Sequence, residues 1–149
     1  MDKVQFYEDS SYPLEKLLGI GTKIQKVSEK RVWLKSGGNL VIEALTVIDV
    51  NTGKAVDGKR SRETTFFKIN CEAAKEVARQ IRVRNISGII LVDFIDMKNK
   101  QNERQLFDLL QGELQKDKTR TSLIDITKLG LAEITRMKTR APLWEAFGN

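Results

Sequence analysis

Two aspartates each follow a short run of mainly apolar residues, and this shared setting is the clearest chemical signal in the chain. Asp93 follows residues 89–92, and Asp49 follows residues 45–48. Asn51 comes two residues after Asp49, so the two side chains share one face of an extended strand. Because ionised carboxylates are almost never fully buried without a partner, each aspartate is a candidate helix cap, ion-pair partner or metal ligand.

The chain between the two aspartates is long enough to bring their strands together. Residues 51–88 contain a predicted helix, and parallel neighbouring strands need a crossover of this kind. Asp49 and Asp93 would then lie at carboxyl ends of strands, where open α/β sheets bind ligands. A divalent cation relieves the repulsion between two such carboxylates, so we predict that both are metal ligands and that Asn51 orients Asp49. An aspartate at a strand end is also a common turn former or N-cap, and the residues alone leave both interpretations open.

The residue types that are missing narrow the chemistry. The chain has no histidine and one cysteine, Cys71. Catalytic sites that need histidine are therefore excluded within this chain, and so is a typical zinc site. Oxygen ligands suit magnesium, with manganese or calcium as alternatives. We expect no membrane span, because no apolar run approaches about 20 residues, and a cytoplasmic location, because no signal peptide is visible and cysteine is scarce.

The charge balance favours an anionic partner. Lysine and arginine number 26 against 20 acidic residues, which gives a net charge of +6. Nucleic acid is the first partner that such a charge suggests, although a solvated basic surface explains it equally well. The candidate phosphate contacts are Lys54, Lys59, Arg60, Arg62, Lys128, Arg136, Lys138 and Arg140.

Strands and helices alternate along the rest of the chain. Apolar spacing and turn residues predict helices over residues 12–19, 20–28, 71–84 and 100–115, with Asn70 as the N-cap of the third. They predict a hairpin that turns at residues 36–39, and strands over 45–50, 88–93, 121–127 and 131–137. This order indicates an α/β fold, with a mixed sheet flanked by helices.

Several motifs resemble the ribonuclease E/G family of bacterial endoribonucleases. They include Ile48-Asp49-Val50-Asn51-Thr52-Gly53-Lys54 and Val92-Asp93-Phe94-Ile95-Asp96-Met97, with further matches over residues 32–38, 72–82 and 127–136. The resemblance implies that residues 31–140 form a deoxyribonuclease I-like catalytic subdomain. Residues 1–30 would end a ribonuclease H-like subdomain, and residues 141–149 would form a tail.

The resemblance also implies an activity. Asp49 and Asp93 would hold magnesium, and Asn51 would orient Asp49. The substrate would be single-stranded RNA, cut to 5′-phosphate and 3′-hydroxyl ends in RNA processing and decay. The family's OB-fold domain, 5′-end sensor and Cys-x-x-Cys zinc link have no counterpart here, and the connection at Glu43-Ala44 is short. We therefore expect a fragment. Its alternative functions are a non-catalytic RNA-binding or assembly module, which could form homo-oligomers, and a deoxyribonuclease or other phosphodiesterase.

Overall fold

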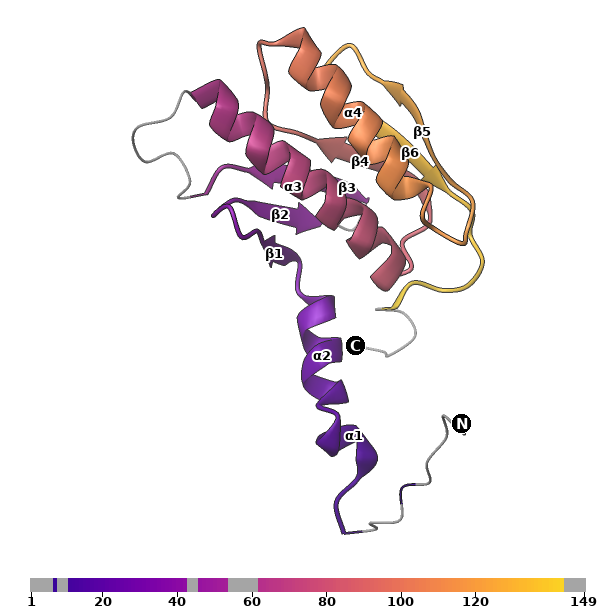
Figure 1. The fold of residues 1–149 in the computed structure, drawn as a ribbon. Coiled ribbons are helices and arrows are strands. Elements are labelled where there is room, and N and C mark those ends of the chain that lie inside the picture. Colours follow the sequence, from indigo (N-terminus) through magenta and orange to yellow (C-terminus); the bar gives the residue numbers. More distant parts are fainter. Residues whose placement is uncertain (1–6, 8–10, 43–45, 54–61, 144–149) are drawn as a thin grey trace, which may run out of the picture.

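The computed structural model describes residue 7 and residues 11–42, 46–53 and 62–143 (Figure 1). Within these residues, six strands form one sheet in the order β1-β2-β3-β4-β6-β5. β3 and β4 run parallel, and the other four pairings are antiparallel. The predicted mixed sheet is therefore confirmed. The strands are β1 (Arg31–Trp33), β2 (Asn39–Ile42), β3 (Val47–Asn51), β4 (Gly88–Asp93), β5 (Thr121–Ile126) and β6 (Ala132–Arg136).

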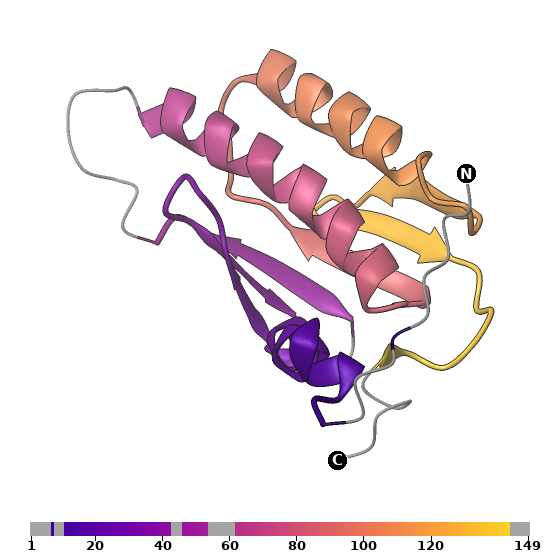
Figure 2. The ribbon, with the colours of Figure 1, turned by 60° about the horizontal axis from the view of Figure 1, so that its bottom comes forward.

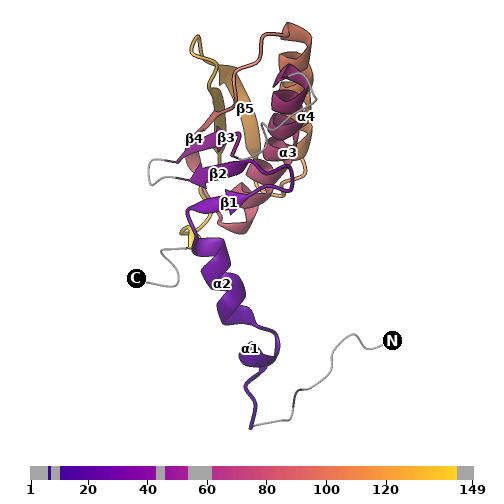
Figure 3. The same ribbon diagram turned by 90° about the vertical axis from the view of Figure 1, so that its left-hand side faces the viewer.

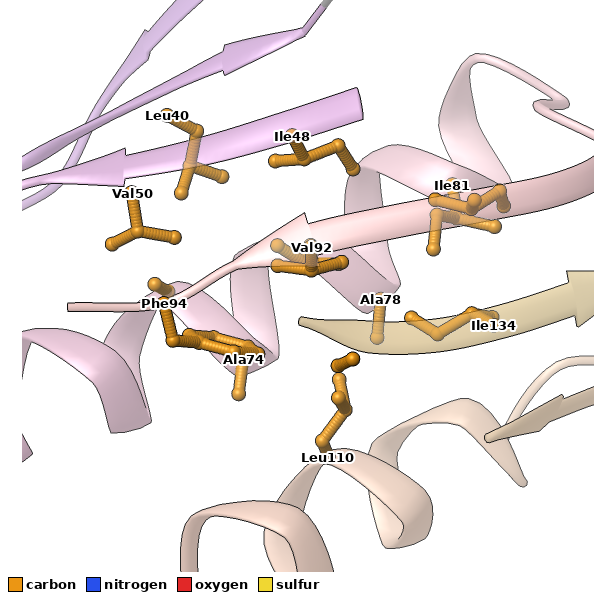
Figure 4. Close-up of a cluster of buried hydrophobic side chains, with 14 of the residues drawn as sticks. Leu40, Ile48, Val50, Ala74, Ala78, Ile81, Val92, Phe94, Leu110 and Ile134 are labelled. Atoms are coloured by element: carbon orange, nitrogen blue, oxygen red, sulfur yellow. The ribbon is translucent and has the colours of Figure 1, made fainter. Parts of the chain in front are cut away.

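Two long helices cover one face of this sheet. They are α3 (Arg62–Val83) and α4 (Lys100–Leu114), which lie side by side on the same side of the strands (Figures 2 and 3). Alternate strand residues point toward them and form the core, while their neighbours in sequence face the other way. Figure 4 shows this core, which includes Ile48, Val50, Ala74, Ala78, Val92, Leu110 and Ile134.

Helix α3 is longer than the sequence predicted. The prediction began it at Cys71 with Asn70 as the N-cap, but the helix begins at Arg62 and Asn70 lies buried in its interior. The apolar stripe through Ala73 and Val77 extends one turn earlier to Ile69, which is also buried. The charged and polar residues of the first turn hid this extension, because they resemble the loop before it.

Two short helices precede the sheet, as predicted. They are α1 (Leu14–Leu17) and α2 (Ile20–Ser28), and they extend away from the sheet (Figures 1 and 3). Gly19 separates them in a left-handed conformation, with φ 60°, which glycine adopts without steric cost. Among the residues that the structure describes, no helix has the length and apolar character needed to cross a membrane.

The predicted hairpin between β1 and β2 is confirmed, and its turn packs against the end of β3. The Leu34 amide donates to the Gly38 carbonyl at 2.9 Å, and the Gly37 amide donates to the Leu34 carbonyl at 3.1 Å. A Cβ atom added at Gly53 would lie 2.1 Å from the Gly37 carbonyl oxygen, and one at Gly38 would lie 2.7 Å from the Asn51 carbonyl oxygen. The turn and the end of β3 therefore touch with no room for side chains between their backbones.

Candidate metal centre

Asp49 and Asp93 lie side by side on the face of the sheet opposite helices α3 and α4. β3 and β4 are parallel neighbours, and Asp49 is the register partner of Asp93. Register partners project from the same face, and adjacent strands lie about 4.8 Å apart. Both residues are exposed. The crossover predicted from the sequence is confirmed, and it brings two carboxylates to neighbouring positions. Asp93 ends β4 as expected, whereas Asp49 lies in the middle of β3, which continues to Asn51.

Asn51 holds the first of these carboxylates. Its side-chain amide nitrogen, Nδ2, donates a hydrogen bond to Oδ2 of Asp49 at 2.9 Å. This bond links two residues on the same face of β3, as the strand alternation predicted. A carboxylate accepts more than one hydrogen bond or ligand, so Asp49 keeps the capacity to contact a cation while its orientation is held.

The electrostatics at this edge are unfavourable without a cation. The pKa of Asp93 is raised, first because partial burial disfavours its charged form and then because Asp49 and Asp96 carry like charges. Asp96 therefore contributes to the field at Asp93. A divalent cation bound at this edge would offset the repulsion among these carboxylates.

The donor set fits magnesium or manganese. The described residues contain no group of three or more His, Cys, Asp or Glu side chains arranged to hold a metal ion. Magnesium, however, keeps several waters and is commonly bound by one or two carboxylates together with substrate phosphates. Two neighbouring carboxylates on an exposed face provide that arrangement, and their oxygen atoms suit a hard cation.

Sequence reasoning missed the residues that hold the segment after Asp93. The buried side chain of Asn70 donates to the Ile95 carbonyl at 2.8 Å and accepts from the Ile95 amide at 3.0 Å. Glu63 accepts from the amides of Lys98 and Asn99, both at 3.1 Å. These two amide bonds lower the pKa of Glu63. Helix α3 thus anchors the chain beyond Asp93 at two points. The sequence signal for Asn70 is its position one helical turn before Ala74, in line with the apolar stripe of α3.

The predicted phosphate contacts occupy different places in the fold. Lys54, Lys59 and Arg60 lie outside the described residues, as does the short connection at Glu43-Ala44. The other candidates except Arg136 have exposed side chains. Those are Arg62, Lys128, Lys138 and Arg140.

Only some of these exposed cations share an edge of the sheet with the two aspartates. Val92 pairs with Ala132, so the β5–β6 turn that carries Lys128 lies at the Asp93 end of β4. Gly88 pairs with Arg136, which puts the chain carrying Lys138 and Arg140 at the other end of that strand. Arg62 precedes Glu63, whose contacts with Lys98 and Asn99 place it near the Asp93 end.

Arg136 requires a correction, because its side chain is buried and fully engaged. Its Nε donates to Oδ2 of Asp117 at 2.8 Å, with only 5% and 6% of the two side chains exposed. Its Nη1 donates to Oδ1 of Asn85 at 2.8 Å and to the Ile86 carbonyl at 3.1 Å. A guanidinium enclosed in this way holds the fold together and is not accessible to an RNA phosphate.

Comparisons with known proteins agree on one family. The model of the Ribonuclease E/G family matches residues 1–139. Ribonuclease G of Escherichia coli is 44% identical over 140 residues, which cover 92% of this chain and 28% of that protein. Ribonuclease E of Nostoc sp. is 41% identical over 149 residues, which cover 98% of this chain and 21% of that protein. The chain therefore spans less than a third of the length of these curated relatives.

Proposed function

Because the chain belongs to the ribonuclease E/G family, we propose that it is part of a magnesium-dependent endoribonuclease that hydrolyses phosphodiester bonds of single-stranded RNA. The observation that carries this proposal is the register pairing of Asp49 with Asp93, with Asn51 bonded to Asp49. In this proposal, residues 31–140 form the deoxyribonuclease I-like catalytic subdomain, and residues 1–30 belong to a preceding one. The ion is magnesium, and manganese would serve through the same oxygen ligands.

The residues at this edge have distinct tasks in the proposed reaction. Asp49 and Asp93 would hold the ion, which when bound lowers the pKa of water and stabilises charge on phosphoryl oxygens. Asn51 keeps the carboxylate of Asp49 in one orientation. Asn70 and Glu63 fix the segment after Asp93, so the two carboxylates keep their spacing when RNA binds.

The products follow from which bond breaks. Water adds to phosphorus, the bond between phosphorus and the 3′ oxygen breaks, and the 3′ oxygen leaves as a hydroxyl. One RNA strand then ends in a 3′-hydroxyl and the other begins with a 5′-phosphate. Lys128 lies in the turn at the Asp93 end of β4, and Arg62 begins α3 near the segment that follows Asp93. In this proposal the two cations contact phosphates on either side of the scissile one.

A second candidate is a non-catalytic RNA-binding or assembly module. The comparisons leave it open, because the chain matches less than a third of the length of the named ribonucleases, so their activity is itself a proposal for this chain. As such a module, the same surface would bind RNA, alone or as a homo-oligomer, without hydrolysing it.

A cleavage assay with two matched variants separates these candidates. The wild-type chain, Asp93→Asn and Asp108→Asn are each incubated with single-stranded RNA and magnesium. Asp108 is an exposed aspartate on α4, on the helix side of the molecule. Cutting by the wild type and by Asp108→Asn, but not by Asp93→Asn, supports the nuclease. If all three forms bind RNA and none cuts it, the result supports the non-catalytic module. Equal cutting by all three forms would show that Asp93 is not needed for hydrolysis.

A further inference from the structure

A pocket lies beside the metal-binding edge, between the chain that follows Asp93, helix α4 and the β5–β6 turn. Its volume is about 180 Å³, more than ten times the roughly 10–15 Å³ that one water needs. Phe94, Leu106, Phe107 and Ile126 supply apolar lining. Four charged residues also line it, Asp96, Lys100, Glu103 and Lys128, so the pocket is of mixed polarity and is large enough to accept a flat ring.

The aromatic side chains give this lining a defined shape. The rings of Phe94 and Phe107 meet edge to face, with centroids 6.3 Å apart and planes at 79°. Phe94 is buried, while Phe107 is half-buried. Ile126, on the opposite wall, has 38% of its surface exposed. Apolar surface of Phe107 and Ile126 is thus accessible on two elements that face the same space.

Polar groups lie among the remaining lining residues. Asp96 offers a hydrogen-bond acceptor, and Lys128 offers a donor. Thr127 accepts at Oγ1 from the Leu129 amide at 3.2 Å and the Leu131 amide at 3.1 Å, which leaves its hydroxyl hydrogen for another partner. A lining that combines apolar side chains with donors and acceptors matches a nucleobase, which has flat faces and a polar edge.

The pocket is close to the paired aspartates along the chain. Phe94 is the residue after Asp93, and Asp96 is three residues after it. Three residues span at most about 11 Å even when fully extended. Asp93 faces away from helices α3 and α4, whereas Phe94 points toward them. A strand whose phosphate lies at Asp93 therefore has to pass around the end of β4 to place a neighbouring base in the pocket.

We propose that this pocket binds one nucleobase of a single-stranded RNA, adjacent to the phosphate held at Asp49 and Asp93. The inference rests on the proposed function, because it assumes that RNA lies across this edge. It assigns a base-binding role to Phe107 and Ile126, and a role in reading the base edge to Asp96 and Thr127.

RNA oligonucleotides that each lack one base, at a different position, test this assignment. The probes are single-stranded oligoribonucleotides of one sequence, each with an abasic nucleotide at a different position, bound to the 149-residue chain without magnesium. Loss of one stacked base weakens binding by about 5- to 150-fold. We expect a loss of this size at one position and smaller losses elsewhere.

Matched variants tie that position to the pocket. Ile126→Trp fills the pocket, and Ile126→Ala removes part of its wall, so both should reduce the position-specific loss to less than about threefold. Ile124→Trp is the control, because Ile124 is 59% exposed on the same strand and does not line the pocket. That variant should keep the full loss. Circular dichroism identifies any variant that fails to fold, and Ile126→Ala then carries the test.

The outcomes test the base-binding proposal separately from the proposed nuclease activity. The base-binding role of the pocket is contradicted if no single abasic position weakens RNA binding more than the others. It is also contradicted if the position-specific loss of affinity persists in both Ile126 variants. Either result holds even if the chain cuts RNA. A loss that the Ile126 variants remove supports the pocket even if no RNA is cut, and in that case only the hydrolytic function is rejected.

Discussion

The side-chain amide of Asn70 bonds both backbone polar groups of Ile95, two residues beyond Asp93. One bond is 2.8 Å long and the other is 3.0 Å, and Asn70 itself is fully buried within helix α3. The helix that forms the crossover between β3 and β4 therefore also fixes the chain that leaves β4. In this way one element sets both the pairing of the two strands and the path of the segment that follows the second aspartate.

Replacing Asn70 should cost stability through this pair of bonds. Asn70→Leu leaves the Ile95 amide and carbonyl without partners, and each unsatisfied buried group costs about 1–3 kcal/mol. We expect the free energy of unfolding to fall by about 2–6 kcal/mol in urea titrations. Asn102→Ala is the control, because the Asn102 side chain is partly exposed and donates to Glu63 at 3.3 Å. Equal losses in the two variants would contradict the assigned role of Asn70.

Breaking the buried ion pair should be more damaging. Arg136→Met leaves the Asp117 carboxylate buried without its guanidinium, and loss of one partner of a buried pair costs about 3–5 kcal/mol. The control is Lys116→Met, which removes an ion pair to Glu113 from a lysine side chain that is 62% exposed. That change should cost about 1 kcal/mol or less. A small effect of Arg136→Met would show that the pair contributes little.

The same pair predicts how stability depends on pH. Burial raises the pKa of Asp117, but hydrogen bonds from Arg136, the Thr119 amide and the Thr121 hydroxyl outweigh it and lower the pKa overall. A lowered carboxyl pKa contributes stability that is present above the unfolded value and lost as the pH falls through the folded value. Stability should therefore fall below a pH of about 4. Asp117→Asn should be less stable than the wild type at neutral pH, and its stability should fall less steeply as the pH is lowered. If its stability falls as steeply as that of the wild type, other carboxyl groups cause the acid destabilisation.

The raised pKa of Asp93 predicts the opposite dependence of stability on pH. Its stabilising contribution is present when the carboxyl is protonated and is lost as the pH rises through the folded pKa. At neutral pH and without metal, Asp93→Asn should therefore be at least as stable as the wild type. Magnesium at about one hundred times its dissociation constant should stabilise the wild type by about 2.7 kcal/mol, and should not stabilise the variant.

Thermal unfolding with and without magnesium measures both effects. The comparison without added magnesium uses sodium chloride to match the ionic strength. Asp108→Asn should respond to magnesium as the wild type does, because it lies on α4 away from the strand ends. Equal stabilisation of Asp93→Asn and the wild type would mean that the ion binds elsewhere.

The position of the cations predicts which ones contact RNA. Arg62→Gln and Lys128→Gln remove charge at the edge that carries the aspartates. Each should weaken binding and make the slope of log affinity against log salt shallower by about 0.7, the value for one phosphate of a single strand. Lys138→Gln and Arg140→Gln remove the same charge at the other end of β4 and should change binding little. Fluorescence anisotropy over a range of salt concentrations measures all four. Equal effects would indicate non-specific attraction by net charge.

The alternation of strand residues accounts for most of what the sequence predicted correctly. Apolar runs that end in Asp49 and Asp93 identified two strands, and the predicted helix between them implied their parallel pairing. The same alternation also held a signal for Arg136, which shares the buried face of β6 with Ala132 and Ile134. The prediction that Arg136 contacts phosphate was wrong because it did not take into account that Arg136 lies on the buried face of β6.

Other features depend on interactions between residues far apart in the sequence. Asp117, the partner of Arg136, lies after α4, and nothing in its local sequence marks it as buried. Asn70 resembled an N-cap because asparagine is common there, and its bonds to Ile95 arise only when α3 packs against the end of β4. Local patterns identify elements and faces, whereas partners for buried polar groups are set by packing.

The close approach of Gly37 and Gly53 makes the hairpin turn part of what holds β3 in place at the position of Asp49 and Asn51. A methyl group at position 53 would overlap the Gly37 carbonyl, so even alanine there must displace the hairpin or shift the end of β3, two residues after Asn51. Damage at this glycine would be expressed as weaker ion binding, although no ligand is changed. Ion binding would thus depend on a glycine that supplies no ligand atom.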